Sequence, residues 1–350
     1  MSGYKIRPFC QDDLPQVEMS LASLYKVSRQ ACSDFLKWKY FKNPYSRSPL
    51  IVVAEHEGII AGQYTYTPMG WRHSATGSEE VILAPGGAFV LPEHRNKGLF
   101  GRMMSFGREW LSADYRWFLN TTSTSNSAAT YEKFGAFPLA ERQFLDSCSC
   151  PGLLHYCFNY RKGNAARIRY GEYGDILVSE SILPGEMSSI ACRRILSAPA
   201  VELKRDDVFY GWRYQNPAKK YTFYYAGRPG EITGYLAVSH NRNNLRGYIV
   251  DYGQSDSCSL EKILHFIKSK RHFDILSIYE FCADEEFSEL LSVGDFKKDR
   301  MVRSLEQRVT PFYPLYLVKT GEGESGWFWD GLDLRRINNW RMMGAARELD

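Results

Sequence analysis

The feature that most constrains the fold of this 350-residue chain is a repeated aromatic segment. The sequence FLKWKYFKNP at residues 35–44 returns as FYGWRYQNP at residues 209–217, so that Trp38 and Trp212 occupy matching places. Each copy follows a helical stretch and precedes two strands joined by a glycine turn. Chance does not readily produce both the motif and its matching flanks. The sequence therefore predicts two tandem copies of one α/β unit.

Length and composition agree with two folded domains and exclude several classes of protein. Hydrophobic residues make up 44% of the chain and aromatic residues 15%, which is enough for real cores. The net charge of +4 is spread without a dense basic block, which argues against a nucleic-acid surface. No secretory pattern opens the chain, and no apolar run approaches the roughly 20 residues of a membrane span. The eight cysteines are scattered without zinc spacing, so we expect reduced thiols, a cytoplasmic protein and no metal.

The sequence RNKGLFG, from Arg95 to Gly101, is the strongest candidate for a binding site. It follows a hydrophobic run at residues 81–92 and opens an amphipathic helix in which Met103, Met104 and Leu111 share one face. A basic glycine turn between a strand and a helix presents backbone N–H groups and positive charge to a pyrophosphate. In isolation, such a turn can equally be a plain helix cap.

A second segment follows about thirty residues later. After a strand expected at residues 117–121, the sequence TSTSNSAATYEKFGAF begins with polar residues typical of a helix start. A short helix carrying Tyr131 is expected to end at Gly135, before another apolar strand.

These two segments resemble a known family. VLPEHRNKGLFG at residues 90–101 is similar to the acyl-CoA-binding segment of the GCN5-related N-acetyltransferases (GNAT), and SAATYEKFG at residues 127–135 is similar to the segment that follows it in that family. Two departures stand out: Phe100 occupies a position that is usually small, with Gly101 one place later, and Thr124 replaces an expected Asn, with Asn126 displaced. The resemblance implies an α/β (α+β) fold of two tandem acetyltransferase-like domains, each a mixed, mostly antiparallel central sheet flanked by helices.

The resemblance also implies roles for individual residues and acetyl-CoA, or another acyl-CoA, as the co-substrate. Tyr131 would protonate the departing thiolate, and a backbone N–H near Val90 to Leu91 would polarise the thioester carbonyl, with Gly86 and Gly87 interrupting the strand before it. The residues expected to bind the cofactor are Val90, Leu91, Arg95, Asn96, Lys97, Gly98, Leu99, Phe100, Gly101, Asn126 and Ser127. A general base is not resolved, and the candidates are Glu55, Glu79, Glu80, His94, Asp251, Asp330 and Asp333.

The second unit lacks the glycine turn. The corresponding stretch, residues 245–266, keeps a strand and a helix but places Asp251 and Asp256 where a pyrophosphate would lie. Negative charge opposes phosphate binding, so one cofactor site per chain is expected. We assign residues 1–150 to the acyl-CoA-binding domain, 151–170 to a crossover linker, 171–318 to a second, degenerate domain and 319–350 to a C-terminal extension.

The acceptor is the least constrained part of the reaction. A small-molecule primary amine is expected, with an amino sugar of surface polysaccharide placed first because paired-domain enzymes of this kind often act on such amines. The aromatic residues Trp38, Tyr40, Tyr64, Tyr66 and Trp71 could line its pocket. Packing is favoured for Trp38 and Tyr40, which recur in the second unit, and Tyr64 and Tyr66 are the better pocket candidates. Two other functions stay open: an aminoacyl-tRNA-dependent ligase of the cell-wall type and a non-catalytic acyl-CoA sensor.

Overall fold

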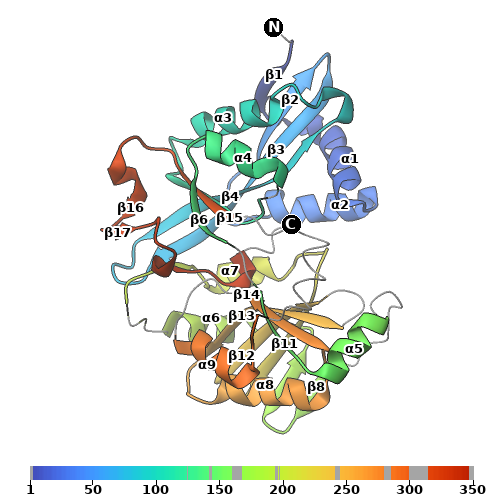
Figure 1. The fold of residues 1–350 in the computed structure, drawn as a ribbon, viewed down its shortest axis with the longest axis vertical. Helices are drawn as coiled ribbons and strands as arrows, with labels where there is room; N and C mark the ends of the chain where they lie inside the picture. The colour runs from blue at the N-terminus through green and yellow to red at the C-terminus, as the bar shows by residue number, and fades with distance from the viewer. Residues whose placement is uncertain are drawn as a thin grey trace.

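The computed structural model contains two mixed sheets, one above the other in Figure 1. It describes residues 3–123, 125–141, 144–159, 168–193, 196, 198–240, 245–279, 285–298 and 314–346. Most strand pairs in both sheets are antiparallel, and helices cover the sheets. The fold class expected from the sequence is therefore confirmed.

The first sheet has the strand order β1-β2-β3-β4-β5-β15-β6, and short strands extend one side of it. Its long central strand β3 pairs with β2 and β4, and at its far end with β10, which in turn pairs with β18. The bounds are β1 (Lys5–Pro8), β2 (Leu50–His56), β3 (Ile59–His73), β4 (Glu79–Val90), β5 (Trp117–Asn120), β6 (Phe137–Glu141), β10 (Val201–Leu203), β15 (Pro314–Lys319) and β18 (Trp340–Arg341).

Helices cover both faces of the first sheet because its strands are apolar on both sides. On one face, α1 (Leu14–Tyr25) and α2 (Arg29–Leu36) bury a cluster with alternate residues of β2. On the other face, α3 (Leu99–Leu111) and α4 (Ser125–Lys133) pack against Tyr64 and Tyr66 of β3. The buried side of α3 has the periodicity expected from the sequence. Gly107 allows its close approach, since a Cβ there would lie 2.1 Å from the Tyr66 hydroxyl.

The second sheet has the order β7-β14-β13-β12-β11-β9-β8. Its strands β11 to β14 repeat the pattern of β2 to β5, including a parallel pair between the last two and an irregularity between the middle two. The strands are β7 (Phe144–Cys148), β8 (Gly171–Tyr173), β9 (Ile176–Ser179), β11 (Lys220–Ala226), β12 (Gly234–His240), β13 (Arg246–Gln254) and β14 (Ile275–Tyr279). The helices are α5 (Cys150–Asn159), α6 (Pro184–Arg193), α7 (Asp207–Arg213), α8 (Ser259–Lys270) and α9 (Glu285–Gly294).

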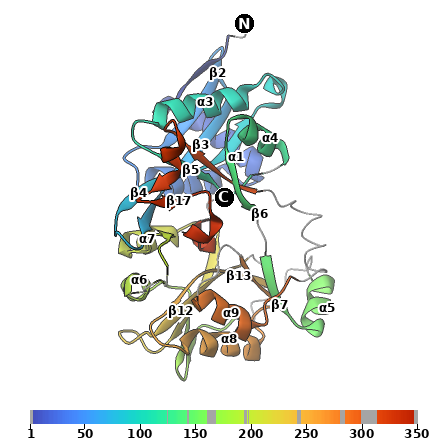
Figure 2. The same cartoon turned by 60° about the vertical axis from the view of Figure 1, so that its left-hand side comes forward.

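Each sheet borrows a strand from the other half of the chain. β15, from near the C-terminus, lies between β5 and β6 of the first sheet (Figure 1). β7, which follows β6 in the sequence, pairs instead with β14 of the second sheet (Figure 2). The boundaries expected at residues 150 and 318 therefore do not separate the two sheets, and the first part of the expected linker, residues 151–159, lies in the helix α5. Strand pairing over such distances leaves no local signal in the sequence.

The repeated tryptophans meet each other at the junction of the two halves. The Trp38 and Trp212 rings are stacked with centroids 5.3 Å apart. Each indole N–H donates to the backbone carbonyl of the other residue, at 2.8 and 3.0 Å. This reciprocal arrangement is the contact that a two-fold axis between two copies would produce. The packing role preferred for Trp38 in the sequence is thus its role in the structure.

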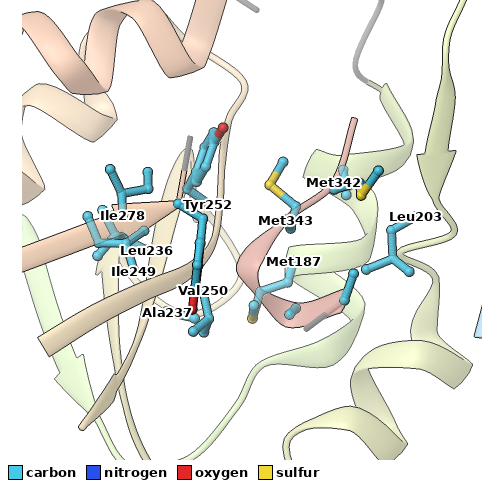
Figure 3. Close-up of a cluster of buried hydrophobic side chains, with 14 of the residues drawn as sticks. Met187, Leu203, Leu236, Ala237, Ile249, Val250, Tyr252, Ile278, Met342 and Met343 are labelled. Atoms are coloured by element: carbon cyan, nitrogen blue, oxygen red, sulfur yellow. The ribbon is translucent and has the colours of Figure 1, made fainter. Parts of the chain in front are cut away.

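The C-terminal extension, expected to be irregular and rich in aromatic residues, is folded against both halves. Trp329 stacks on Trp117 of β5 at 5.5 Å. Met343 belongs to the same buried cluster as Met187 of α6 and residues of the second sheet such as Val250 and Tyr252 (Figure 3). The extension contains the two-stranded pair β16 (Phe328–Trp329) and β17 (Leu332–Asp333), with short 3₁₀ turns at residues 324–327, 337–339 and 344–346.

Candidate functional site

The candidate site lies where strands β4 and β5 separate. Within the described residues, these parallel strands pair at one position, Leu83 with Phe118, and then diverge. The side chain of Asn120 spans the gap, because its Nδ2 donates to the Pro85 carbonyl at 3.2 Å. A gap between two central strands leaves backbone groups of β4 without a strand partner, and these groups can bind a ligand.

A bulge in β4 lies next to this gap. The register with β3 shifts between Gln63 and Thr65, opposite Gly86 and Gly87. Gly87 has φ of 55°, and a Cβ there would lie 2.6 Å from Thr65 Oγ1. Thr65 donates to the Gly86 carbonyl at 2.8 Å and bonds the Tyr40 hydroxyl at 2.7 Å. The two glycines thus interrupt regular pairing, as the sequence suggested.

The backbone N–H groups of Val90 and Leu91 point in opposite directions. Leu91 N–H donates to the Ala61 carbonyl of β3 at 2.9 Å. Since donors alternate along an antiparallel strand, Val90 N–H faces away from β3, toward the gap. The Val90 carbonyl lies on the same side and accepts from Arg95 Nε at 3.1 Å. Of the two N–H groups expected at the thioester, that of Leu91 is therefore already hydrogen-bonded within the sheet, and that of Val90 is the one directed to the gap.

The turn at residues 95–101 forms a nest of backbone donors at the start of α3. Asn96 and Gly98 both adopt left-handed conformations, with φ of 60° and 69°. Gly98 is the N-cap of α3, and no side chain caps the helix there. In the described part of the chain, the N–H groups of residues 96–101 donate to no protein acceptor. This geometry and the helix dipole suit an anion.

The side chains of the turn have several different roles. Lys97 Nζ donates to the Tyr4 hydroxyl at 3.0 Å, and that hydroxyl also bonds His94 Nδ1 at 2.7 Å. Leu99 is buried in the core, so its contribution to binding is limited to the backbone. Phe100 contacts the rings of Tyr64 and Tyr131, with centroids 5.4 and 6.3 Å away.

Gly101 is small for a packing reason that the sequence did not reveal. A Cβ at this position would lie 3.2 Å from the ring of Phe134, which directly follows α4. The absence of a Cβ therefore lets α3 pack closely against the end of α4. Among the other expected cofactor residues, Ser127 is half-buried in α4, whereas Thr124 and the side chain of Asn126 lie outside the described residues.

Tyr131 lies at the gap, on α4, and its side chain is 2% exposed. Its hydroxyl oxygen is 2.6 Å from the hydroxyl oxygen of Tyr64 and 2.6 Å from Nδ2 of Asn120. Tyr131 and Tyr64 line a small cavity of about 10 Å³, together with Pro85 and Met104. The sequence identified Tyr131, whereas Asn120 carries no motif and was missed.

The borrowed strand contributes to the same site. Tyr316 of β15 stacks on Tyr131 with centroids 5.3 Å apart and planes 8° from parallel. Its hydroxyl donates to Glu132 Oε1 at 2.8 Å. The sequence assigned residues 314–318 to the second domain, so this contact could not be anticipated.

The matching helix of the second half has no open anion site. The Asp256 carboxylate accepts the N–H groups of Cys258 and Ser259 at 3.0 and 2.8 Å, and Gln254 Oε1 accepts Leu260 N–H at 3.0 Å. Burial alone would raise the pKa of Asp256, but these hydrogen bonds lower it below its usual value. The start of α8 therefore carries its own fixed anion, as expected from the sequence.

Asp251 does not lie at that helix start. It is fully buried and pairs with Arg205 at 2.8 Å, within a cluster of tyrosine hydroxyls that includes Tyr214 and Tyr235. The other candidate bases also have partners away from Tyr131. Glu55 pairs with Arg7, Glu79 with Lys204, Glu80 with Arg116 and Asp333 with Arg335, while Asp330 accepts from Thr76 and Ser78 and His94 bonds Tyr4.

The aromatic residues expected around an acceptor lie in the core, and two of them, Tyr64 and Tyr66, line the small cavity beside Tyr131. Tyr64, Tyr66, Trp38, Tyr40 and Trp71 are all buried. Across the described ranges, no group of three or more His, Cys, Asp or Glu side chains is arranged to hold a metal ion. The same ranges contain no helix with the length and apolar character needed to span a bilayer.

Comparisons with known proteins agree with this architecture. Residues 5–138 match the family described as an acetyltransferase (GNAT) domain. The fold is similar to a GCN5-related N-acetyltransferase from Anabaena variabilis, with a TM-score of 0.58 and 13% identity over 91% of this chain and 73% of that chain. No curated protein matches the sequence significantly.

Two further solved structures have the same fold. A probable N-acyltransferase from Enterococcus faecalis has a TM-score of 0.62 and 9% identity, over 91% of this chain and 73% of that one. A tandem GNAT protein from the clavulanic acid biosynthesis pathway has a TM-score of 0.52 and 12% identity, over 92% of this chain and all of that one. At such low sequence identities, these similarities show a shared fold and nothing more.

Proposed function

We propose that this chain is an acyl-CoA-dependent N-acyltransferase, on the premise that residues 5–138 match the acetyltransferase (GNAT) domain family and that the fold is similar to that of a tandem GNAT protein. The observation that carries the proposal is the contrast between two helix starts. The N–H groups of residues 96–101 lack protein acceptors in the described structure, whereas those of α8 are occupied by Asp256 and Gln254. One pyrophosphate site per chain follows.

The proposed reaction uses backbone and side-chain groups at the β4–β5 gap. Val90 N–H would polarise the thioester carbonyl, and Tyr131 would protonate the departing thiolate. The cavity beside Tyr131 holds at most about one water molecule. Proximity of the two substrates supplies a large part of the acceleration.

The acceptor in this proposal is a primary amine of a small molecule, and an amino sugar is the first candidate. We place the reaction in the cytoplasm, because the scattered cysteines of the sequence suit reduced thiols. Acetyl-CoA is the expected donor.

Calorimetric titration of the full chain with acetyl-CoA tests the cofactor assignment. We expect one molecule bound per chain and weaker binding in Gly98→Val, since a β-branched residue is strained at φ of 69° and the donors of the nest would be displaced. Gly77→Val is the matched control, because Gly77 has φ of 73° and open space around it in a turn outside the site. Absence of binding to folded wild-type protein would refute the proposal.

Release of free thiol with a panel of amines, including amino sugars, tests the chemistry. Turnover supports the transferase. Tight binding of acetyl-CoA without turnover favours the acyl-CoA sensor, and activity that depends on aminoacyl-tRNA favours the ligase.

A further inference from the structure

The orientation of the Asn120 side chain is fixed by its neighbours. Its Oδ1 accepts the N–H of Thr122 at 3.0 Å, and its Nδ2 donates to the Pro85 carbonyl at 3.2 Å. A reversed amide would place two acceptors together and two donors together. Nδ2 must therefore also be the donor in its 2.6 Å contact with the Tyr131 oxygen.

Tyr64 supplies a second donor to the same oxygen. Its hydroxyl is buried and lies 2.6 Å from that of Tyr131. Burial, followed by the proximity of Tyr131 and Tyr66, raises the pKa of Tyr64 well above its usual value, so the hydroxyl keeps its proton. Since buried donors are normally satisfied, the Tyr64 proton points to the Tyr131 oxygen.

Two donors on one phenol oxygen fill its two lone pairs. Tyr131 can then only donate its own proton, to a third group. When it does so, the negative charge that forms on its oxygen is stabilised by the hydrogen bonds from Asn120 and Tyr64. Hydrogen bonds to a charged form favour that form, and they are stronger than bonds between neutral groups.

We propose that Asn120 and Tyr64 are positioning residues that stabilise the phenolate formed when Tyr131 protonates the leaving thiolate. This inference rests on the proposed acyl transfer. The amine nitrogen bonds to the thioester carbon, the C–S bond breaks and its electron pair passes to sulfur. The proton of Tyr131 moves to that sulfur and leaves the O–H electron pair on the phenolate. The proton lost by the amine nitrogen then restores Tyr131 through water.

Tyr64→Phe is the main test, and Tyr66→Phe is its matched control. Tyr66 lies on the same face of β3, but its buried hydroxyl has no hydrogen-bond partner among the described residues and packs against Gly107. We expect Tyr64→Phe to lower kcat about tenfold to a hundredfold, leave KM for acetyl-CoA unchanged and move the alkaline limb of the pH–kcat profile to higher pH. The limb moves because Tyr131 then holds its proton more tightly. Tyr66→Phe should change neither kcat nor the profile.

Asn120→Leu, of similar shape but without a donor, should displace the alkaline limb in the same direction. A merely structural role would lower kcat in these variants without moving the limb. Lower kcat with an unmoved limb in both variants would therefore overturn the inference.

A readout without substrate separates this inference from the proposed function. Difluorotyrosine at position 131 of the full chain ionises nearer neutral pH than tyrosine, and its absorbance follows the ionisation. We expect ionisation at lower pH with Tyr64 present than in the Tyr64→Phe background. Should wild-type protein show no turnover while this difference is seen, the proposed function fails, although Tyr64 is still shown to stabilise the ionised form of residue 131. Equal ionisation in the two backgrounds overturns the inference.

Discussion

Replacing Tyr131 by Phe should reduce both turnover and stability, for separate reasons. Turnover should fall about 10²–10⁴-fold, the range typical of a lost general acid. Stability should fall because the Tyr64 hydroxyl loses its partner inside the core, and one buried unpaired hydroxyl costs about 1–3 kcal/mol. Asn120 keeps its bond to the Pro85 carbonyl, so its contribution to the loss is smaller. Acetyl-CoA binding should be unchanged, since the nest lies on α3.

Urea denaturation, thiol-release kinetics and calorimetry measure these three quantities in one set of proteins. The double variant Tyr64→Phe, Tyr131→Phe removes both hydroxyls, so no unpaired hydroxyl remains between these rings. It should recover most of the stability lost in Tyr131→Phe and none of the turnover. Turnover of Tyr131→Phe equal to wild type would refute the acid role. A double variant no more stable than Tyr131→Phe would refute the argument from the unpaired hydroxyl.

Two other predictions concern the fold. Trp38→Phe and Trp212→Phe each remove an indole donor from a buried carbonyl, and each should lower the unfolding free energy by about 1–3 kcal/mol in urea titrations. Because the two rings stack on each other, the losses in the two single variants should not add in the double variant. A double variant whose loss equals the sum of the single losses would contradict this coupling between the rings. Burial, with a contribution from Lys270, lowers the pKa of His272 from 6.5 to about 4. The unfolded chain therefore binds a proton that the folded chain does not, and stability should fall as the pH drops from about 6.5 to about 4. His272→Gln should flatten this part of the profile, and an unchanged slope would contradict the assignment.

The parts of the site that could be predicted from the sequence are those defined by local conformation. The nest at residues 96–98 depends on a left-handed glycine after a strand and before a helix, and these features lie within one short segment. The bulge at Gly86 and Gly87 and the helix that carries Tyr131 are local in the same way. The repeat containing Trp38 and Trp212 indicated two related units, although it did not show that the two rings touch.

The parts that could not be predicted depend on contacts between distant segments. Asn120 is an ordinary residue at the end of a strand until α4 brings Tyr131 to it. Gly101 is explained by the ring of Phe134, which follows another helix, α4. The commitment of Leu91 N–H to Ala61 depends on the register between β3 and β4, and the position of Tyr316 depends on the borrowed strand. Neither register nor strand order between distant segments follows from composition or periodicity.

The borrowed strand has a consequence for synthesis on the ribosome. β6 and one edge of β5 remain without their partner strand until β15, at residues 314–319, has been synthesised. That strand is made roughly 170 residues after β6 ends. At ~5–20 residues per second, that interval is about 10 to 30 s. Throughout it, the apolar strand at residues 117–120 has an unpaired edge of the kind that templates aggregation. The nascent chain therefore has reason to depend on a chaperone until β15 emerges.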